Sequence, residues 1–151
     1  MSKILDSGER RTFPSGSVRD ITDGKGRPSL MPLEVVFTLF GGDDVIFCLG
    51  YFKDDNKTVH LYDALKIFAK QAYNASYETM MLEVSKHFED GAKKYGENNW
   101  QKGIPVSCYL DSAIRHYLKY LRGDNDEPHD RAFVWNVMCC IWEVDHHGSE
   151  A

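Results

Sequence analysis

The chain has 151 residues, of which 42% are hydrophobic, 13% aromatic and 27% charged, and its formal net charge is −5. This length and composition predict one globular domain with a substantial core and exclude a largely disordered chain. The acidic balance, without a basic block, argues against a general nucleic-acid binder but leaves room for a site that takes one nucleotide.

Residues 1–30 are polar, rich in Gly, Ser and Arg, and have turn signals without a hydrophobic period. They predict an irregular N-terminal arm ahead of a single helical domain over residues 31–151. A second interpretation is that the arm folds over a bound triphosphate through its basic residues, which are Arg10, Arg11, Arg19, Lys25 and Arg27.

A short apolar helix is expected after Pro32, where a first helical turn tolerates proline. The run VIFCLGYF at 45–52 fits a buried helix or a strand, and we favour a helix because no partner strand follows. Helical periodicity continues at 58–73 and 77–95. After the polar loop 96–106, Ser107 is the expected cap of a helix that ends at Gly123, and the last helix begins near Pro128. Four to five helices predict an all-α bundle.

The helix at 77–95 carries Glu83, His87, Asp90 and Lys94 on one stripe, since they fall at i, i+4, i+7 and i+11. Two acids, an imidazole and an ammonium suit a divalent metal and a phosphate, although a solvated helix face has the same pattern. An interleaved stripe of Met80, Val84 and Phe88 is expected to face the core.

Further polar residues lie downstream. Asp111 and Arg115 are four apart and adjoin His116, as site residues or as a simple intrahelical ion pair. Acids and a histidine crowd the next break, where helix capping alone can explain several of them. Asn136, in an otherwise apolar helix, needs hydrogen-bond partners and suits a nucleobase edge. Trp100 and Trp135 are candidates for a stacking wall, or for the core.

Three segments then show a family resemblance: KKYGENNWQKGIP, YLDSAIRHYLKYLRGD and DEPHDRAFVWN. They resemble the phage-type dATP/dGTP diphosphohydrolase N-terminal domain family, and GERRTFPSGSVRDITDGKGRPSLMPLEVV resembles it more weakly. That family is similar to the MazG-like all-α nucleotide pyrophosphohydrolases. The resemblance implies hydrolysis of dATP or dGTP to a monophosphate and pyrophosphate, in phage nucleotide metabolism. MazG-like enzymes carry ExxE and ExxD motifs, from which this chain departs.

With Mg²⁺ or Mn²⁺ as the expected cofactor, carboxylates supply the ligands. The predicted metal ligands are Glu83, Asp90, Asp111, Asp126 and Asp130. The predicted catalytic residues are Glu83, Asp111, His116 and Lys94. The predicted substrate-binding residues are Lys102, Arg115, Trp100, Asn99, Asn136 and His129. Glu83 and Asp111 are expected to meet because a short loop makes their helices antiparallel neighbours.

The expected partner is a small deoxynucleotide, with no nucleic acid and no membrane. Aromatics beyond what short helices bury easily (Tyr51, Phe52, Tyr62, Phe68 and Tyr73) predict a homo-oligomer. The cysteines do not have metal-ligand spacing, and the sequence shows no signal peptide and no long apolar run. We therefore expect a cytoplasmic protein, in the host cytoplasm if a phage encodes it.

Two other functions stay open. One is a metal-dependent HD-type phosphohydrolase, built on His129-Asp130 with His87 or His116 upstream and Asp145 downstream. The other is a non-catalytic nucleotide-binding or host-interaction module of a phage.

Overall fold

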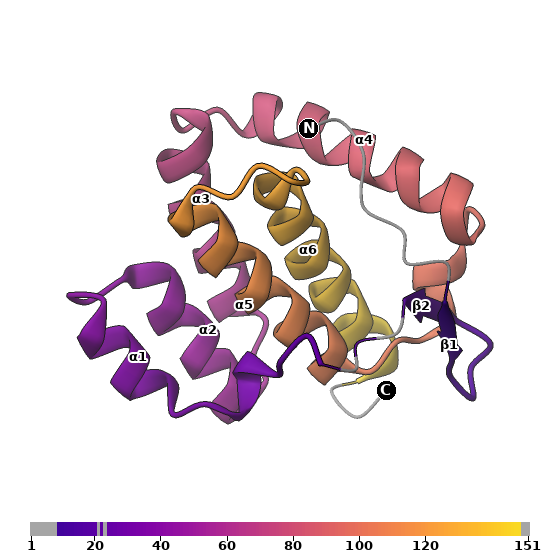
Figure 1. Cartoon of the computed structure of the whole chain (residues 1–151), viewed down its shortest axis with the longest axis horizontal. Coiled ribbons are helices and arrows are strands. Elements are labelled where there is room, and N and C mark those ends of the chain that lie inside the picture. The colour runs from indigo at the N-terminus through magenta and orange to yellow at the C-terminus, as the bar shows by residue number, and fades with distance from the viewer. Residues whose placement is uncertain (1–8, 21, 23, 149–151) are drawn as a thin grey trace.

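A computed structural model describes residues 9–20, 22 and 24–148, and Figure 1 shows its helices. Within this described part, six α-helices, two short 3-10 segments and a two-stranded sheet confirm the all-α class. The α-helices are α1 (Leu33–Leu39), α2 (Asp44–Asp55), α3 (Val59–Tyr73), α4 (Tyr77–Tyr95), α5 (Val106–Arg122) and α6 (His129–His147). None of them is both long and apolar enough to cross a lipid bilayer.

The helix boundaries follow local capping chemistry. Asp43 accepts hydrogen bonds from the backbone N–H groups of Val45 and Ile46 at the start of α2. Gly123 ends α5 in the left-handed conformation, as predicted. The expected cap at Ser107 is wrong, because α5 already begins at Val106 behind Pro105 and Ser107 lies within the first turn.

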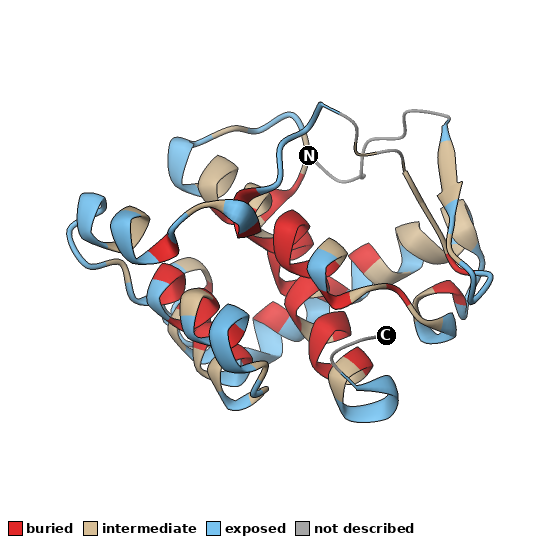
Figure 2. Ribbon diagram, turned by 90° about the horizontal axis from the view of Figure 1, so that it is seen from below, coloured by how far each residue is buried: buried red, intermediate tan, exposed pale blue. Residues whose placement is uncertain are grey.

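The core is centred on α5 and α6, which pack along each other, with α3 against α6 and α2 against α3 (Figures 1 and 2). Tyr109 and Tyr117 from α5, Phe133 from α6 and Phe68 from α3 are fully buried there. Phe68 and Phe133 each contribute about 1.5–3 kcal/mol by burial. The run at 45–52 lies in α2, as favoured, and buries Phe52.

Helix α4 packs chiefly against α6, not against α5 as the short connection suggested. Met80 and Val84 are buried and Phe88 packs against the core, which confirms the apolar stripe. Leu82, on the opposite side of α4, is exposed to solvent.

The N-terminal segment differs from the irregular arm that the sequence predicted. Its described residues include strands β1 (Arg10–Thr12) and β2 (Val18–Asp20), paired antiparallel as a hairpin, and the 3-10 turn η1 (Pro28–Leu30). The hairpin lies beside the C-terminal end of α4 (Figure 1). Strands of three residues surrounded by Gly and Ser carry too little alternation to be recognised from sequence.

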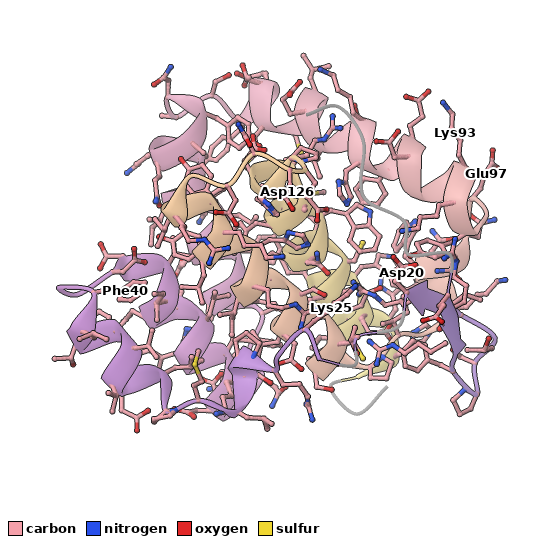
Figure 3. All side chains as sticks on the ribbon, viewed as in Figure 1. Asp20, Lys25, Phe40, Lys93, Glu97 and Asp126 are labelled. Carbon is pink, nitrogen blue, oxygen red and sulfur yellow. The ribbon has the colours of Figure 1, made fainter. Side chains whose placement is uncertain are left out.

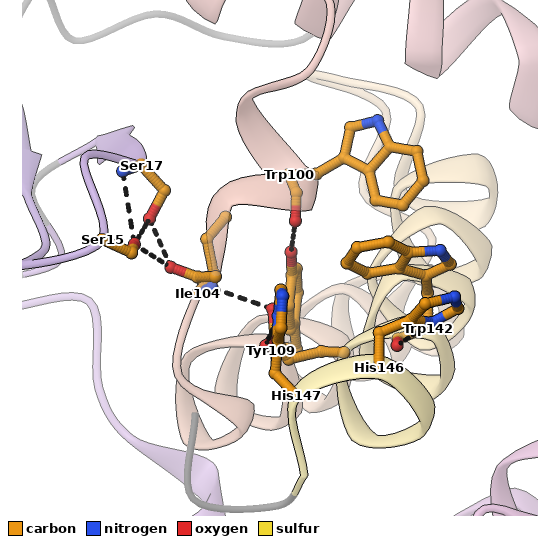
Figure 4. Close-up of polar contacts among 10 residues, drawn as sticks. Ser15, Ser17, Trp100, Ile104, Tyr109, Trp142, His146 and His147 are labelled. Atoms are coloured by element: carbon orange, nitrogen blue, oxygen red, sulfur yellow. Dashed lines mark hydrogen bonds and ion pairs between the residues drawn. The ribbon is translucent and has the colours of Figure 1, made fainter.

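The corner between α4 and α5 holds the hairpin loop in place (Figure 4). It contains the 3-10 turn η2 (Asn99–Lys102), after which the Gly103 carbonyl accepts hydrogen bonds from the hydroxyls of Ser15 and Ser17. Gly103 has φ +111°, and a Cβ there would lie 3.3 Å from that of Ser15. The backbone N–H of Ile104 donates to the fully buried carboxylate of Glu143 at 2.9 Å.

Candidate functional site

A cavity of about 520 Å³ lies where the hairpin, α4, α5 and the start of α6 meet. Its volume falls in the range of small-molecule sites. The lining residues come from segments far apart in the sequence: Val18, Arg19, Asp20, Thr22, Lys25, His87, Gly91, Lys94, Tyr95, Asn99, Ser112, Arg115, His116, Lys119, Asp126, Glu127, Trp135 and Asn136. Asp20, Lys25 and Asp126 mark three of its walls in Figure 3.

The charge of this lining is opposite in sign to that of the whole chain. Five cationic side chains line it against three carboxylates, whereas the formal net charge of the chain is −5. Such a local excess of positive charge attracts anionic ligands. The cavity is therefore suited to a phosphate-bearing molecule.

Arg19 of β2 is held in place by contacts with α5 and α6. Its Nη2 donates to Ser112 Oγ at 3.1 Å and to Asn136 Oδ1 at 3.3 Å. Its guanidinium carbon lies 5.4 Å and 5.7 Å from the ring centroids of Tyr109 and Trp135. These contacts fix the guanidinium plane against α5 and α6 before any ligand binds.

Two further contacts hold β2 in this position. Asn99 binds both backbone groups of Val18, accepting from its N–H and donating to its carbonyl, each at 2.7 Å. Lys94 forms an ion pair with Asp20 at 2.8 Å, and Tyr95 donates to the same carboxylate. Burial raises the pKa of Asp20, but the hydrogen bonds from Lys94 and Tyr95 outweigh it, so that the pKa is lower than usual.

Three cavity-lining side chains each have a buried nitrogen without a hydrogen-bond partner among the residues described: Arg19 Nη1, His87 Nδ1 and Trp135 Nε1. Buried polar atoms normally have partners, so together they indicate a polar ligand. Burial, together with the charges of Arg131, Arg19 and Lys94, lowers the pKa of His87 to about 3. His87 is therefore neutral at physiological pH and offers hydrogen bonds without adding charge.

Histidines and carboxylates gather at the α5–α6 end of the cavity. The Nδ1 atoms of His116 and His129 are 2.9 Å apart, and His129 Nε2 lies 2.7 Å from Asp126 Oδ1. Ligand atoms of His116, Glu127 and His129 lie within 4.8 Å of one another, and so do those of Asp124, Asp126 and His129. Burial and the neighbouring His129 hold the pKa of His116 well below its usual value.

The cavity collects many of the residues singled out from the sequence. Among those that line it are His87, Lys94, Asn99, Arg115, His116, Asp126, Trp135 and Asn136, and His129 adjoins it. Two amides have structural partners: Asn99 binds Val18, and Asn136 binds Arg19 and the Ala132 carbonyl. Asn136 therefore orients a cation, a role that the nucleobase interpretation did not include.

The structure does not bring Glu83 and Asp111 together. Glu83 pairs with Lys86 on the same helix. Asp111 is buried and accepts from Arg27 Nε at 2.8 Å and from the backbone N–H of Ser29 at 2.9 Å. Burial raises the pKa of Asp111, but these hydrogen bonds lower it below the usual value. Asp111 thus fixes η1 onto α5 and does not form the expected pair with Arg115.

Four other predicted residues lie outside the cavity lining. Asp90 faces Arg131 at 3.5 Å, and Asp130 accepts from the Tyr73 hydroxyl. Lys102 is exposed on η2. Trp100 packs edge-on against Phe88. It also packs edge-on against Trp142 (Figure 4).

The HD-type arrangement is only partly assembled. His116 and His129 meet, but Asp130 turns toward Tyr73 and Asp145 lies in the last turn of α6. At 1.5 Å per residue, the helix separates Asp145 from His129 by roughly 24 Å. Asp145 therefore cannot share a metal with this pair.

Several residues of the cavity lining are absent from the predicted catalytic, substrate-binding and metal residues, among them Arg19, Lys25, Ser112, Lys119 and Glu127. The basic content of residues 1–30 was the signal for Arg19 and Lys25. Ser112 and Lys119 lie at i−3 and i+4 from Arg115, so the helical period places them on the same face of α5.

Comparisons with known proteins bear on this cavity. Searches of curated proteins and of solved structures find no match. A family model described as dATP/dGTP diphosphohydrolase, N-terminal, matches residues 66–151, which include α4, α5, α6 and most of the cavity wall. The match leaves out the hairpin that carries Arg19. The chain belongs to the dATP/dGTP diphosphohydrolase N-terminal domain family.

Proposed function

We propose that this protein hydrolyses dATP or dGTP to the deoxynucleoside monophosphate and pyrophosphate, with the triphosphate bound in the cavity between the hairpin and helices α4 to α6. The family name supports nucleotide hydrolysis. The observation that carries the proposal for this chain is Arg19, a fixed guanidinium whose Nη1 lacks a partner among the described residues of a cation-lined cavity.

In this proposal, different cations bind different oxygens of the triphosphate. Arg19 presents planar N–H groups that suit two oxygens of one phosphate. Arg115 is held by the Gly26 carbonyl at 2.7 Å and by Ser112 at 3.0 Å, so it is ordered in the same way. Lys25 and Lys119 complete the lining near Arg115 as point charges for the remaining oxygens.

The uncharged side of the cavity suits the nucleoside. Trp135 and His87 stand together, with ring centroids 5.6 Å apart, and each has a buried nitrogen without a partner in the described structure. An indole N–H donates to a ring nitrogen or carbonyl of a purine, and neutral His87 adds a second polar contact without attracting another phosphate.

A divalent ion belongs to the proposed reaction, and the residues that fit it are the histidine and carboxylate groups at the α5–α6 end. Glu83, Asp90 and Asp111 do not form such a group, whereas His116, Glu127 and His129 do. When bound, the ion neutralises phosphate charge and lowers the pKa of an attacking water. The chain itself orients the phosphates and shields them from bulk water.

A nucleotide panel tests this function. The purified protein is incubated with each deoxynucleoside and ribonucleoside triphosphate, with Mg²⁺ or Mn²⁺, and the products are resolved by chromatography. Pyrophosphate and a monophosphate from dATP or dGTP are expected. Release of inorganic triphosphate or phosphate instead would favour an HD-type reaction, and saturable nucleotide binding without turnover would identify a non-catalytic module.

A further inference from the structure

The histidine and carboxylate groups at the α5–α6 end contain a more specific site than a general carboxylate site for Mg²⁺. Its members come from three adjacent segments: His116 from α5, Glu127 from the connecting loop, and His129 from the first position of α6. His116 and Glu127 line the cavity, while His129 is buried behind them. A ligand held here would therefore face the cavity.

The distance between the two imidazoles matches that of metal ligands. Their Nδ1 atoms are 2.9 Å apart. Metal–nitrogen bonds of about 2.0–2.1 Å place neighbouring ligands of an octahedral ion about 3 Å apart, and those of a tetrahedral ion slightly further. The two nitrogens thus already have the separation that a shared ion requires.

Asp126 selects the tautomer of His129 that binding needs. Its Oδ1 lies 2.7 Å from His129 Nε2, and a carboxylate can only accept, so Nε2 carries the proton. The Nδ1 atom that faces His116 then bears a lone pair. Histidines that bind metals commonly donate their other N–H to a carboxylate in this way.

Of the carboxylates nearby, Glu127 is the one best placed to bind. Both oxygens of Asp124 accept from Arg122, at 2.7 Å and 2.5 Å, and Asp126 is engaged with His129. The Glu127 carboxylate has no hydrogen bond within the described part of the chain, and it lies within 4.8 Å of both imidazoles. It is half-buried at the edge of the cavity.

We propose that His116, Glu127 and His129 bind one first-row transition metal ion, such as Mn²⁺, Fe²⁺, Co²⁺ or Zn²⁺, in preference to Mg²⁺, with Asp126 positioning His129. Two imidazoles and one carboxylate suit these ions, because Mg²⁺ prefers oxygen ligands and keeps several waters. The use of the ion in hydrolysis rests on the proposed function, whereas the binding does not.

The test is a Co²⁺ titration of the full-length protein after chelation and dialysis, without nucleotide, followed by visible absorption and by calorimetry. We expect ligand-field bands that saturate at one ion per chain, displacement by Zn²⁺ and Mn²⁺, and no displacement by a large excess of Mg²⁺. Glu127→Gln and Asp126→Asn are each expected to weaken binding roughly 10–100-fold, and His129→Gln to abolish the bands.

The control is His146→Gln, on the exposed end of the same helix, which should bind Co²⁺ as the unmodified protein does. Circular dichroism and melting in chelator show whether each variant is folded, and Glu127→Gln, at the cavity edge, keeps the test valid if His129→Gln does not fold. Unchanged Co²⁺ affinity in folded Glu127→Gln, or no saturable binding to the unmodified protein, would overturn the site and leave a hydrogen-bonded histidine pair.

The two proposals fail in different ways. Stoichiometric Co²⁺ binding without hydrolysis of any nucleotide keeps this site and rejects the proposed function. Hydrolysis with Mg²⁺ that survives in Glu127→Gln, in a protein that does not bind Co²⁺, keeps the function and rejects the site.

Discussion

At the scale of single residues, a substitution of Arg19 gives the most direct test of the proposed function. Arg19→Lys keeps the positive charge but loses the planar fork and its stacking on Tyr109 and Trp135. We expect kcat/KM for the preferred nucleotide to fall by roughly 10²-fold, as for other fixed donors to developing charge. Steady-state kinetics on pyrophosphate release measure the change.

A matched control lies on the neighbouring strand. Arg11 is opposite Arg19 in the hairpin register and does not line the cavity. Arg11→Lys should leave kcat/KM within about twofold, since it changes no group that the substrate meets. Equal losses in both variants would mean that the hairpin fold, and not the Arg19 guanidinium, accounts for the effect.

The buried His87 leads to a prediction of how the stability of the protein depends on pH. Its pKa is about 3 in the folded protein against an ordinary value of 6.5, because of burial and the nearby charges of Arg131, Arg19 and Lys94. The unfolded chain therefore binds the proton more readily, so stability is complete above pH 6.5 and falls as the pH is lowered toward 3. By pH 5 the loss is on the order of 2 kcal/mol.

Urea unfolding of the unmodified protein and of His87→Gln at pH 7 and pH 5, in the presence of chelator, isolates this loss. The pKa of His116 is also below its usual value, and His116 contributes to the pH dependence of both proteins. His87→Gln should reduce the difference between the two pH values, because it removes the titrating group. Asp20 and Asp111 do not interfere, since their pKa values lie below the ordinary 3.8 and their contributions are lost only at lower pH. An equal pH dependence in His87→Gln would contradict the assignment.

Individual residues were predictable from sequence where the helical period orders them. His87 and Lys94 share a stripe of α4 and do reach one cavity, and Arg115 and His116 reach it from α5. Glu83 lies on the same stripe but one turn too early, and it pairs with Lys86. The period fixes a direction around the helix axis, but where along that axis the ligand lies depends on tertiary packing.

At the scale of elements, η1 is held to α5 chiefly through Asp111. This carboxylate accepts from Arg27 and from the backbone of Ser29, and it is 5% exposed. In Asp111→Asn the ion pair with Arg27 is lost, and an NH2 group, which can only donate, replaces one of the two accepting oxygens. We expect a loss of stability of about 1–3 kcal/mol, with Co²⁺ affinity unchanged.

Thermal melting and the Co²⁺ titration together check this prediction. Asp63→Asn, on α3 away from the cavity, is the control, and its melting temperature should stay near that of the unmodified protein. If Asp111→Asn instead lost Co²⁺ binding while keeping its melting temperature, Asp111 would be a metal ligand, as the sequence first suggested.

The helices and the hairpin differ in how far along the sequence their stabilising residues lie. Helices α3 and α4 were predictable almost to the residue, because their apolar periods and breaks lie within the segment. The hairpin was not, because its strands are stabilised by Asn99 and Gly103, more than 80 residues away. No window of sequence around residues 10–20 contains those partners.

At the scale of the whole molecule, we predict self-association through the outer face formed by α1, α2 and α3. An aromatic row runs across α1, α2 and α3, with ring centroids of Phe37 and Phe47 5.2 Å apart, Phe47 and Tyr51 4.6 Å, and Tyr51 and His60 5.4 Å. Phe47 and Tyr51 are 43% and 47% exposed. Exposed apolar patches of this kind mark contact surfaces.

Light scattering during size exclusion should therefore give a mass above the 17.3 kDa of one chain. Phe47→Glu is expected to shift the protein toward the monomer, because it places a charge in the patch. Leu82→Glu, on the exposed face of α4, should leave the mass unchanged. A monomer at every concentration would exclude this interface.

The contact between the hairpin and α6 joins residues far apart in the sequence, and this separation has a consequence for biosynthesis. Arg19 binds Asn136, which lies 117 residues further along the chain. At a ribosomal rate of about 5–20 residues per second, that partner is synthesised roughly 6–23 s after Arg19. For this interval the nascent chain has a basic arm without its binding surface. The helices can form as they emerge, but the cavity closes only after Asn136 has been synthesised.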